Sequence, residues 1–474
     1  MKKTFIFSLA ILLLGIQSFA KKNSVSINNK HRIEFKINGL KDTILTIGYH
    51  FGNSKYVADT LQINHDGIAI MQGDSLLIPG IYIAILPDKS NFDFLIDKDQ
   101  IFSIETSKDN LLGNLKYANS PINSDFNAYQ SFMKEMQSRV NAIQERQKKV
   151  LPNSDSSIIL KKNLIEVDNM VRDKWAQLSD KEKGNLLGIL IALIKTPQIP
   201  EFDVPSNINN KDSLRWLMGY EYQKKHYWDD INLSDPRILR TPIFESRLNN
   251  YFTNIVIQSP DSLKPEIDKI INASSKNKET YQFVVSSLLN HFNQSNIMTH
   301  DELFVYISDK YYLSGKTPWA SKKLLDDIKK FADNIRPNIV GKIAPNLILE
   351  SDHGEYIALN QLRNKYTIIY FFEPNCSHCQ QETPVLYEFY QQVKDKGVDV
   401  YCIYTQYKKE EWQKYLAEKN YEWINVWDAN YNSNFRSLYN ITSTPTIYLL
   451  DKDKKIVAKR ISVESLKEIL KDLQ

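Results

Sequence analysis

The chain contains 474 residues, of which 42% are hydrophobic and 24% are charged, proportions typical of globular proteins. Its length exceeds that of one domain, so we expect about two to four domains. The formal charge of +4 at pH 7 is too small for a nucleic-acid-binding surface, and we expect no nucleic-acid partner. Three cysteines are too few for a secreted scaffold that depends on structural disulfides.

Residues 1–20 have the pattern of a secretory signal peptide. Two lysines precede an apolar run over residues 5–16, which is short for a membrane span, and residues 18–20 provide a small-residue cleavage site. Cleavage there lowers the formal charge from +4 to +2, because this segment holds two lysines and no acidic residue. The sequence therefore predicts an exported protein.

Residues 21–118 are predicted to form an all-β domain. Short segments rich in β-branched and aromatic residues alternate with turn signals such as Asn38-Gly39 and Pro79-Gly80. The clearest strand segments are residues 33–37, 43–49, 81–86 and 92–96. Strands at intervals of about ten residues are typical of a small sandwich or an open barrel.

Residues 119–335 are predicted to form an all-α domain. Apolar side chains recur at intervals of three and four residues, as on the buried face of a helix. The apolar segment 186–194 is too short to cross a bilayer, so we expect a buried helix there. The other segments with the helical period are residues 126–143, 164–178, 244–256, 265–273, 280–292, 301–312 and 322–331. Such helices joined by short linkers indicate stacked α-hairpins.

Residues 336–474 follow a linker signal at Arg336-Pro337-Asn338 and show strands that alternate with helices. Strands are expected at residues 366–372, 398–404 and 423–426, helices at 380–396, 410–419 and 434–439, and a hairpin with a final helix at 446–473. This order predicts a compact α/β domain. The whole chain is therefore expected to be a multidomain α+β protein.

Cys376 and Cys379 form a C-x-x-C pair where the strand 366–372 gives way to the helix 380–396. A helix N-terminus supplies free backbone N–H groups and the positive end of a dipole, both of which favour a thiolate. Chance is a poor explanation for this spacing in a chain with three cysteines. We interpret the pair as a redox dithiol, and we expect Cys402, within an apolar strand, to be an inert core thiol.

Several motifs resemble those of thioredoxin-fold domains of the TlpA/ResA type, which are thiol-disulfide oxidoreductases of the membrane envelope. The matching segments are Ala344 to Leu347, Cys376 to Cys379, Glu382-Thr383-Pro384, Thr444-Pro445-Thr446, and the final hairpin and helix. The resemblance covers less than a third of the chain. The first two domains resemble the β-rich and helical domains of unknown function that often precede such domains in Gram-negative envelope proteins.

The resemblance implies roles for residues around the two cysteines. Pro445 would be the cis-proline that faces the active disulfide, and Thr444 and Pro445 would position the backbone of a partner. Glu382 matches the family's glutamate one turn past Cys379, on the same helix face, and would transfer the proton of the resolving thiol.

Two positions depart from the family pattern. Asn375 stands where the family usually has tryptophan, which puts the usual substrate-docking surface in doubt. His378 stands inside the motif where proline is common. It would either tune the redox potential of the pair or face solvent without a role.

These observations predict a periplasmic thiol-disulfide oxidoreductase. Cys376 would attack the disulfide of an envelope protein, and Cys379 would resolve the mixed disulfide. We expect no separate cofactor and no metal, because the Cys376–Cys379 disulfide would itself be the redox group. A reductant in an oxidising compartment also implies a membrane thiol donor upstream.

Three alternatives stay open. A peroxiredoxin-like peroxidase has similar lead-in strands, but residues 373–375 lack the threonine that this class places shortly before its cysteine. The first two domains could instead be the working part and bind an envelope protein or a glycan, with the redox domain as an accessory. A zinc site would need a second pair of ligands beside the C-x-x-C.

Overall fold

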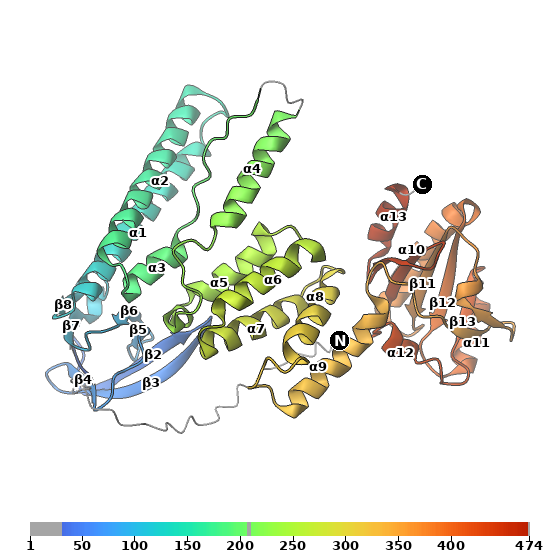
Figure 1. The fold of residues 1–474 in the computed structure, drawn as a ribbon, viewed down its shortest axis with the longest axis horizontal. Coiled ribbons are helices and arrows are strands. Elements are labelled where there is room, and N and C mark those ends of the chain that lie inside the picture. Colours follow the sequence, from blue (N-terminus) through green and yellow to red (C-terminus); the bar gives the residue numbers. More distant parts are fainter. Residues whose placement is uncertain (1–30, 206–209, 473–474) are drawn as a thin grey trace. The chain divides into compact units, whose positions relative to one another are not determined.

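The computed structural model describes residues 31–205 and 210–472 (Figure 1). By packing, these residues separate into two compact units, one made of residues 31–205, 210–258 and 268–284 and the other of residues 259–267 and 285–472. The signal peptide predicted for residues 1–20 lies outside the described residues, and the predicted domain boundaries stay predictions. Within the described ranges, no helix is long and apolar enough to span a membrane.

The first unit begins with a β-sandwich whose two four-stranded sheets have the orders β4-β1-β7-β8 and β3-β2-β5-β6. The residues of strand β1 alternate between the core and the solvent: Ile33, Phe35 and Ile37 are buried, while Arg32 and Lys36 are exposed. This period of two turns one face of each sheet toward a shared core, so the sandwich is formed rather than an open barrel. The strands are β1 His31–Asn38, β2 Thr43–Phe51, β3 Ser54–Ile63, β4 Ile68–Gly73, β5 Gly80–Ile85, β6 Asn91–Ile96, β7 Ile101–Ser107 and β8 Lys116–Ala118.

The middle of the chain is helical, as the apolar periodicity predicts. The α-helices are α1 Pro121–Gln147, α2 Asp155–Lys181, α3 Leu186–Ile194, α4 Lys211–His226, α5 Ile243–Asn250, α6 Pro260–Ser274, α7 Lys278–Asn293, α8 His300–Ile307 and α9 Lys322–Ile335. Helix α3 is the buried apolar helix expected at residues 186–194. Helix α6 begins at Pro260 and not at Pro265, which lies inside it, so the predicted start was wrong. Proline removes one backbone donor but does not always end a helix.

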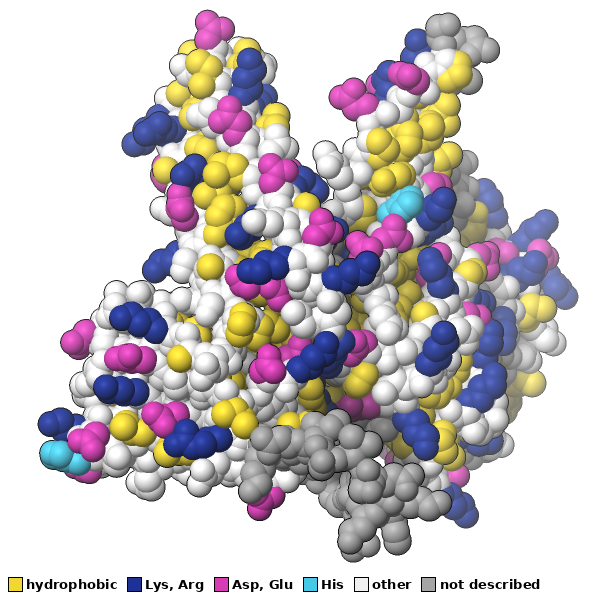
Figure 2. Space-filling model, turned by 60° about the vertical axis from the view of Figure 1, so that its left-hand side comes forward, with side chains coloured by type: hydrophobic (Ala, Val, Ile, Leu, Met, Phe, Trp, Pro, Cys, Tyr) yellow, Lys and Arg dark blue, Asp and Glu magenta, His cyan; other side chains and the backbone are white. Residues whose placement is uncertain are grey.

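The helical period does not mark a core face throughout the first unit. Figure 2 shows hydrophobic side chains at the surface of two projections, one formed by α1 and α2 and the other by α4. Ile159 and Ile165 of α2 and Trp216 of α4 are exposed hydrophobic residues, and Gly219 is the buried residue of α4. Part of the apolar face of these helices is therefore exposed and is not packed against the rest of the unit.

The second unit ends in a seven-stranded sheet with the order β10-β9-β13-β12-β11-β14-β15. Strands β11, β12 and β13 are parallel to one another, and β14 is antiparallel to β11. The strands are β9 Ile348–Ser351, β10 Tyr356–Ala358, β11 Tyr366–Phe372, β12 Val398–Tyr404, β13 Ile424–Trp427, β14 Thr446–Asp451 and β15 Ile456–Lys459. The helices are α10 Ser377–Val393, α11 Lys409–Lys419, α12 Phe435–Leu438 and α13 Val463–Asp472.

Both faces of this sheet are covered. Side chains of α10, α11 and α13 pack on one face, and α12 with the segment before β9 packs on the other. This double burial explains why β11 reads as a continuous apolar run and not as an alternating one. The all-β, helical and C-terminal α/β parts confirm the predicted multidomain α+β class.

Candidate active site

Cys376 lies between the end of β11 and the start of α10. Its backbone N–H donates to the Glu373 carbonyl at 3.1 Å, which closes a turn through Pro374. Cys376 is also the N-cap residue of α10, and its carbonyl accepts from the Gln380 N–H at 3.0 Å. The thiol therefore stands at the N-terminus of a 17-residue helix, where free N–H groups and the helix dipole favour an anion.

The two thiols of the motif differ in their pKa. Burial alone would raise the pKa of the Cys376 thiol, but hydrogen bonds with the Cys379 backbone and thiol, the Thr444 side chain and the His378 backbone together lower it below its ordinary value. Burial raises the pKa of the Cys379 thiol to about 12. Of the two thiols, Cys376 therefore loses its proton at the lower pH, and Cys379 keeps its proton at neutral pH.

A buried polar network lies behind Cys379. The Thr383 hydroxyl donates to the Cys379 carbonyl at 2.6 Å, and the hydroxyls of Thr383 and Tyr370 are 2.8 Å apart. Cys379, Thr383 and Tyr370 are all 1% exposed or less. Burial raises the pKa of Tyr370, so this residue stays a neutral phenol beside the thiol. The network holds the second cysteine in a dry site.

The start of β14 supplies the other wall of the site. Strand β14 pairs antiparallel with β11, with Thr446 opposite Phe371, so its first residues lie beside the cysteine turn. The Cys376 thiol donates to the Thr444 carbonyl at 3.3 Å. The Thr444–Pro445 peptide bond is cis, which confirms the prediction made for Pro445.

The side chains of the remaining residues predicted for the site make fewer contacts there. Glu382 lies on α10 as expected and is partly buried, but it makes no hydrogen bond or ion pair with any described residue. The His378 side chain is exposed, and its backbone rather than its ring contacts Cys376. Asn375 is also exposed. The structure thus brings Cys376, Cys379, Thr444 and Pro445 together, and the roles predicted for Glu382 and His378 stay predictions.

Glu373 is a site residue that the sequence analysis missed. Its carboxylate accepts from the Thr405 hydroxyl at 2.7 Å and from the Gln406 amide at 3.0 Å, and Arg436 lies 3.7 Å away. A hydrogen bond with its backbone also acts on the Cys379 thiol. Thr405 and Gln406 follow β12, whose carboxyl end meets the same sheet edge as that of β11. The sequence could have predicted this contact, because residues that follow two neighbouring parallel strands lie at the same edge of the sheet.

Cys402 lies on β12 in register with Tyr370 and is 1% exposed. Its pKa is raised well above the ordinary value by burial, in keeping with the predicted inert thiol. Cys376, Cys379 and Cys402 are all free thiols in the structure. Within residues 31–205 and 210–472, no group of three His, Cys, Asp or Glu side chains is placed to hold a metal ion.

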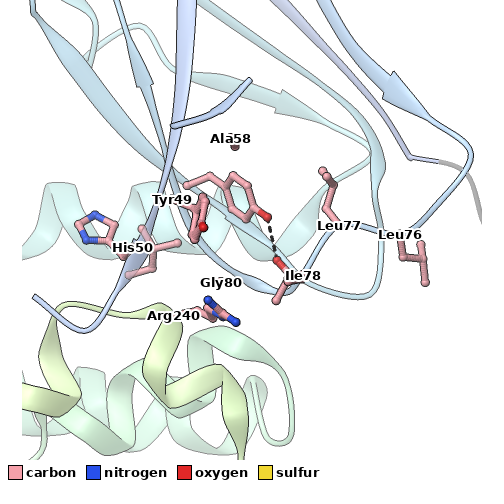
Figure 3. A pocket seen from close by; sticks show the side chains of 10 residues that line it. Tyr49, His50, Ala58, Leu76, Leu77, Ile78, Gly80 and Arg240 are labelled. Carbon is pink, nitrogen blue, oxygen red and sulfur yellow. Dashed lines mark hydrogen bonds between the residues drawn. The ribbon is translucent and has the colours of Figure 1, made fainter. Parts of the chain in front are cut away.

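The β-sandwich of the first unit contains a separate pocket with a volume of about 240 Å³. Figure 3 shows Tyr49, Leu77 and Ile78 around it, with Arg240 reaching up from a helical segment. A Cβ at Gly80 would lie 2.5 Å from the Arg240 Cβ, so glycine is needed for this approach. Arg240 already pairs with Glu279 at 2.5 Å. The pocket is therefore mainly apolar, and it contains none of the redox groups.

Comparisons with known proteins fall on two parts of the chain. Residues 340–459 match the AhpC/TSA family, and residues 172–338 match a domain of unknown function, DUF5106. The thiol-disulfide oxidoreductase ResA of Bacillus cereus is 28% identical over 145 residues, which are 29% of this chain and 79% of ResA. Nucleoredoxin of Mus musculus is 24% identical over 119 residues, which are 25% of this chain and 27% of that protein.

Solved structures add two further likenesses. A domain of a possible thiol-disulfide isomerase from Cytophaga hutchinsonii is 41% identical, with a TM-score of 0.28, over 28% of this chain and 92% of that chain. A thioredoxin-like protein from Bacteroides caccae is 24% identical, with a TM-score of 0.48, over 59% of this chain and 100% of that chain.

The sheet order, the cysteine pair at a helix N-terminus and the family match define the C-terminal part of the chain as a thioredoxin-like domain. This domain matches the AhpC/TSA family, and the chain is a thiol-disulfide oxidoreductase similar to ResA. The predicted resemblance and enzyme class are thereby confirmed.

Proposed function

We propose that this protein is exported and exchanges the Cys376–Cys379 pair with disulfides or thiols of other proteins in the periplasm or cell envelope. The observation that carries the proposal is the contrast between the two thiols. One is partly exposed with a lowered pKa, and the other is buried with a pKa of about 12. Disulfide exchange requires one accessible thiolate and one protected thiol that acts later.

The exchange proceeds in two steps. The Cys376 thiolate attacks one sulfur of a substrate disulfide, so that the substrate S–S bond breaks, a mixed disulfide forms and the departing sulfur takes up a proton. Cys379 then loses its proton and attacks the Cys376 sulfur, which forms the Cys376–Cys379 disulfide and releases the second substrate thiol. Two electrons pass to the substrate, and the reverse sequence oxidises a substrate dithiol.

The second step needs a proton acceptor, because the Cys379 thiol has a pKa of about 12. We assign this role to Glu382, which lies one helical turn past Cys379 on α10 and keeps its carboxylate free of other described partners. Thr444 and Pro445 are assigned the positioning of the substrate backbone, because the Thr444 carbonyl already contacts the Cys376 thiol.

The location and partners are part of the proposal. The signal sequence predicted at residues 1–20 supports export, and the similarity to ResA supports a site of action in the envelope. If the protein reduces its substrates in an oxidising compartment, a membrane thiol donor must return two electrons to Cys376 and Cys379 after each cycle.

The test is the reduction of insulin disulfides, with dithiothreitol as the electron source. Wild type is expected to accelerate the reduction, and Cys376→Ala is expected to abolish the acceleration because the first attack cannot occur. Cys379→Ala should stall at the mixed disulfide, which mass spectrometry can detect on Cys376. Cys402→Ala is the matched control and should retain wild-type activity. Equal activity of wild type and both motif variants would refute the assignment.

A peroxiredoxin-like peroxidase is the second candidate, because a thiolate at Cys376 would also suit attack on a peroxide. Consumption of hydrogen peroxide by the reduced protein, measured beside insulin reduction, separates the two activities. Turnover of peroxide faster than disulfide exchange would favour the peroxidase.

A further inference from the structure

Two tyrosines lie at the same sheet edge as the reactive cysteine. Phe372, Tyr404 and Trp427 are register partners across the parallel strands β11, β12 and β13. Cys376, Tyr407 and Tyr431 follow these three positions in the loops after each strand. Because parallel strands end at a common edge and neighbours are about 4.8 Å apart, the three loops form one continuous surface.

Hydrogen bonds fix the loop of Tyr407 to the cysteine turn. Thr405 and Gln406, directly before Tyr407, donate to the two carboxylate oxygens of Glu373 at 2.7 and 3.0 Å. Glu373 is in turn the residue whose carbonyl accepts from the Cys376 N–H. A polypeptide bound at Tyr407 would therefore lie at a defined place relative to the Cys376 sulfur.

The rings of Tyr407 and Tyr431 are exposed, and contacts between the two residues fix their positions. Tyr407 is 53% exposed and Tyr431 is 58% exposed, and their ring centroids are 4.6 Å apart. The Tyr431 hydroxyl donates to the Tyr407 carbonyl at 3.3 Å. Tyr356 adds a third exposed ring to this tyrosine surface, because its hydroxyl accepts from the Asn430 amide at 2.9 Å. The surface is thus preorganised without being covered by the domain itself.

The backbone at Tyr431 gives an independent observation. Its φ is +54°, in the left-handed region that glycine and asparagine adopt most readily and that a large aromatic residue rarely occupies. The Asp428 carboxylate holds this loop by accepting from the N–H groups of Asn432 and Ser433. Core packing does not account for a tyrosine at this strained position, because the ring is largely exposed.

We propose that Tyr407 and Tyr431, with Tyr356 beside them, bind the polypeptide that flanks the disulfide attacked by Cys376. The proposal rests on the proposed function and deepens it by naming the substrate-contact surface on the β12–β13 side of the cysteine. Tyrosine rings offer large, rigid contact area at a low cost in conformational entropy, and they are enriched at the centres of protein interfaces.

The test compares a protein disulfide with a small one. The reduced full-length protein is mixed with insulin or with bis(2-hydroxyethyl) disulfide, and the second-order rate constant of its oxidation is measured. Tyr407→Ala and Tyr431→Asn should each lower the rate constant with insulin about tenfold, because each removes an interface tyrosine. The rate constant with the small disulfide, which carries no polypeptide, should stay at the wild-type value.

Two controls separate binding from folding. Asparagine tolerates the left-handed backbone, so Tyr431→Asn should unfold at the wild-type temperature or above it. Tyr56→Ala removes an exposed tyrosine of β3 in the first unit and should change neither rate constant. Wild-type rates with insulin in both tyrosine variants would overturn the inference, as would parallel losses with both disulfides together with a lower melting temperature. A wild-type protein that reacts with neither disulfide would instead overturn the proposed function.

Discussion

At the scale of single residues, the chemistry depends on a difference between two cysteines three positions apart. Cys376 is the partly exposed N-cap residue of α10, whereas Cys379 lies in the first turn of the helix and is 1% exposed. Hydrogen bonds lower the pKa of the first thiol, and burial raises that of the second. The same motif therefore provides both a nucleophile and a protected thiol.

The contribution of Thr444 to the Cys376 pKa can be measured directly. Its side chain is one of the groups that lower this pKa, so Thr444→Val should raise it toward the value of an ordinary cysteine. Alkylation of Cys376 by iodoacetamide at pH 7 should then slow, by roughly severalfold, because less thiolate is present. The measurement is the pH dependence of alkylation, with mass spectrometry to identify the cysteine.

The matched control for this substitution is Ser443→Ala. Ser443 is exposed and precedes Thr444, and its hydroxyl does not act on the thiol. This variant should keep the wild-type pH profile. An unchanged profile in Thr444→Val would show that helix and backbone groups alone set the pKa.

At the scale of elements, a buried ion pair ties α8 to strand β15. The Lys459 ammonium lies 2.6 Å from the Asp301 carboxylate and 3.0 Å from the Asn338 side-chain oxygen. Lys459 is 1% exposed, and burial lowers its pKa although Asp301 opposes this shift. The helix and the strand that follows the cis-proline strand are thereby held together within the second unit.

Removal of the Asp301 carboxylate should destabilise the protein. Asp301→Ala leaves the Lys459 charge buried without its counterion, which should lower the free energy of unfolding by about 3 kcal/mol. Urea denaturation followed by tryptophan fluorescence measures the loss. The double variant Asp301→Ala/Lys459→Met should recover most of the stability, because it removes the buried charge as well.

An exposed pair provides the comparison. Lys408 and Glu411 are 2.7 Å apart, with side chains 68% and 43% exposed. Lys408→Ala should therefore change the free energy of unfolding by less than about 0.5 kcal/mol. A loss in Asp301→Ala no larger than the loss in Lys408→Ala would show that the Asp301–Lys459 pair has no stabilising role.

At the scale of the whole molecule, the groups that tune the thiols are local. The residues that act on Cys376, namely Cys379, Thr444 and His378, all lie within residues 336–474. Residues 172–338 match a domain of unknown function, and none of the groups that act on Cys376 comes from that segment. The first unit exposes hydrophobic side chains on α2 and α4, among them Ile159 and Trp216.

This locality predicts the behaviour of the fragment 336–474. Its Cys376 should show the same alkylation profile as the full chain, and its rate constant with bis(2-hydroxyethyl) disulfide should agree within about twofold, because every contact that sets the pKa is retained. A shift of the Cys376 pKa toward that of an ordinary cysteine in the fragment would reveal a longer-range determinant. A folded far-UV circular dichroism spectrum of the fragment is the accompanying control.

The sequence by itself determined the class of fold and the reactive pair. Strand β11 was recognisable as a continuous apolar run of β-branched and aromatic residues, and the C-x-x-C motif followed it directly. Both signals are local, because periodicity and spacing within about 20 residues decide them. The cis bond before Pro445 was also predicted, through the resemblance of residues 444–446 to a known motif.

Only the tertiary structure decided which other residues meet the cysteines. Glu373 and Thr405 are separated along the chain and have no shared motif, and they come together because the parallel strands β11 and β12 end at one edge. The buried pairing of Lys459 with Asp301 likewise depends on a segment that is distant in the sequence. Local patterns specify an element, but the side chains that face one another are set by how the elements assemble.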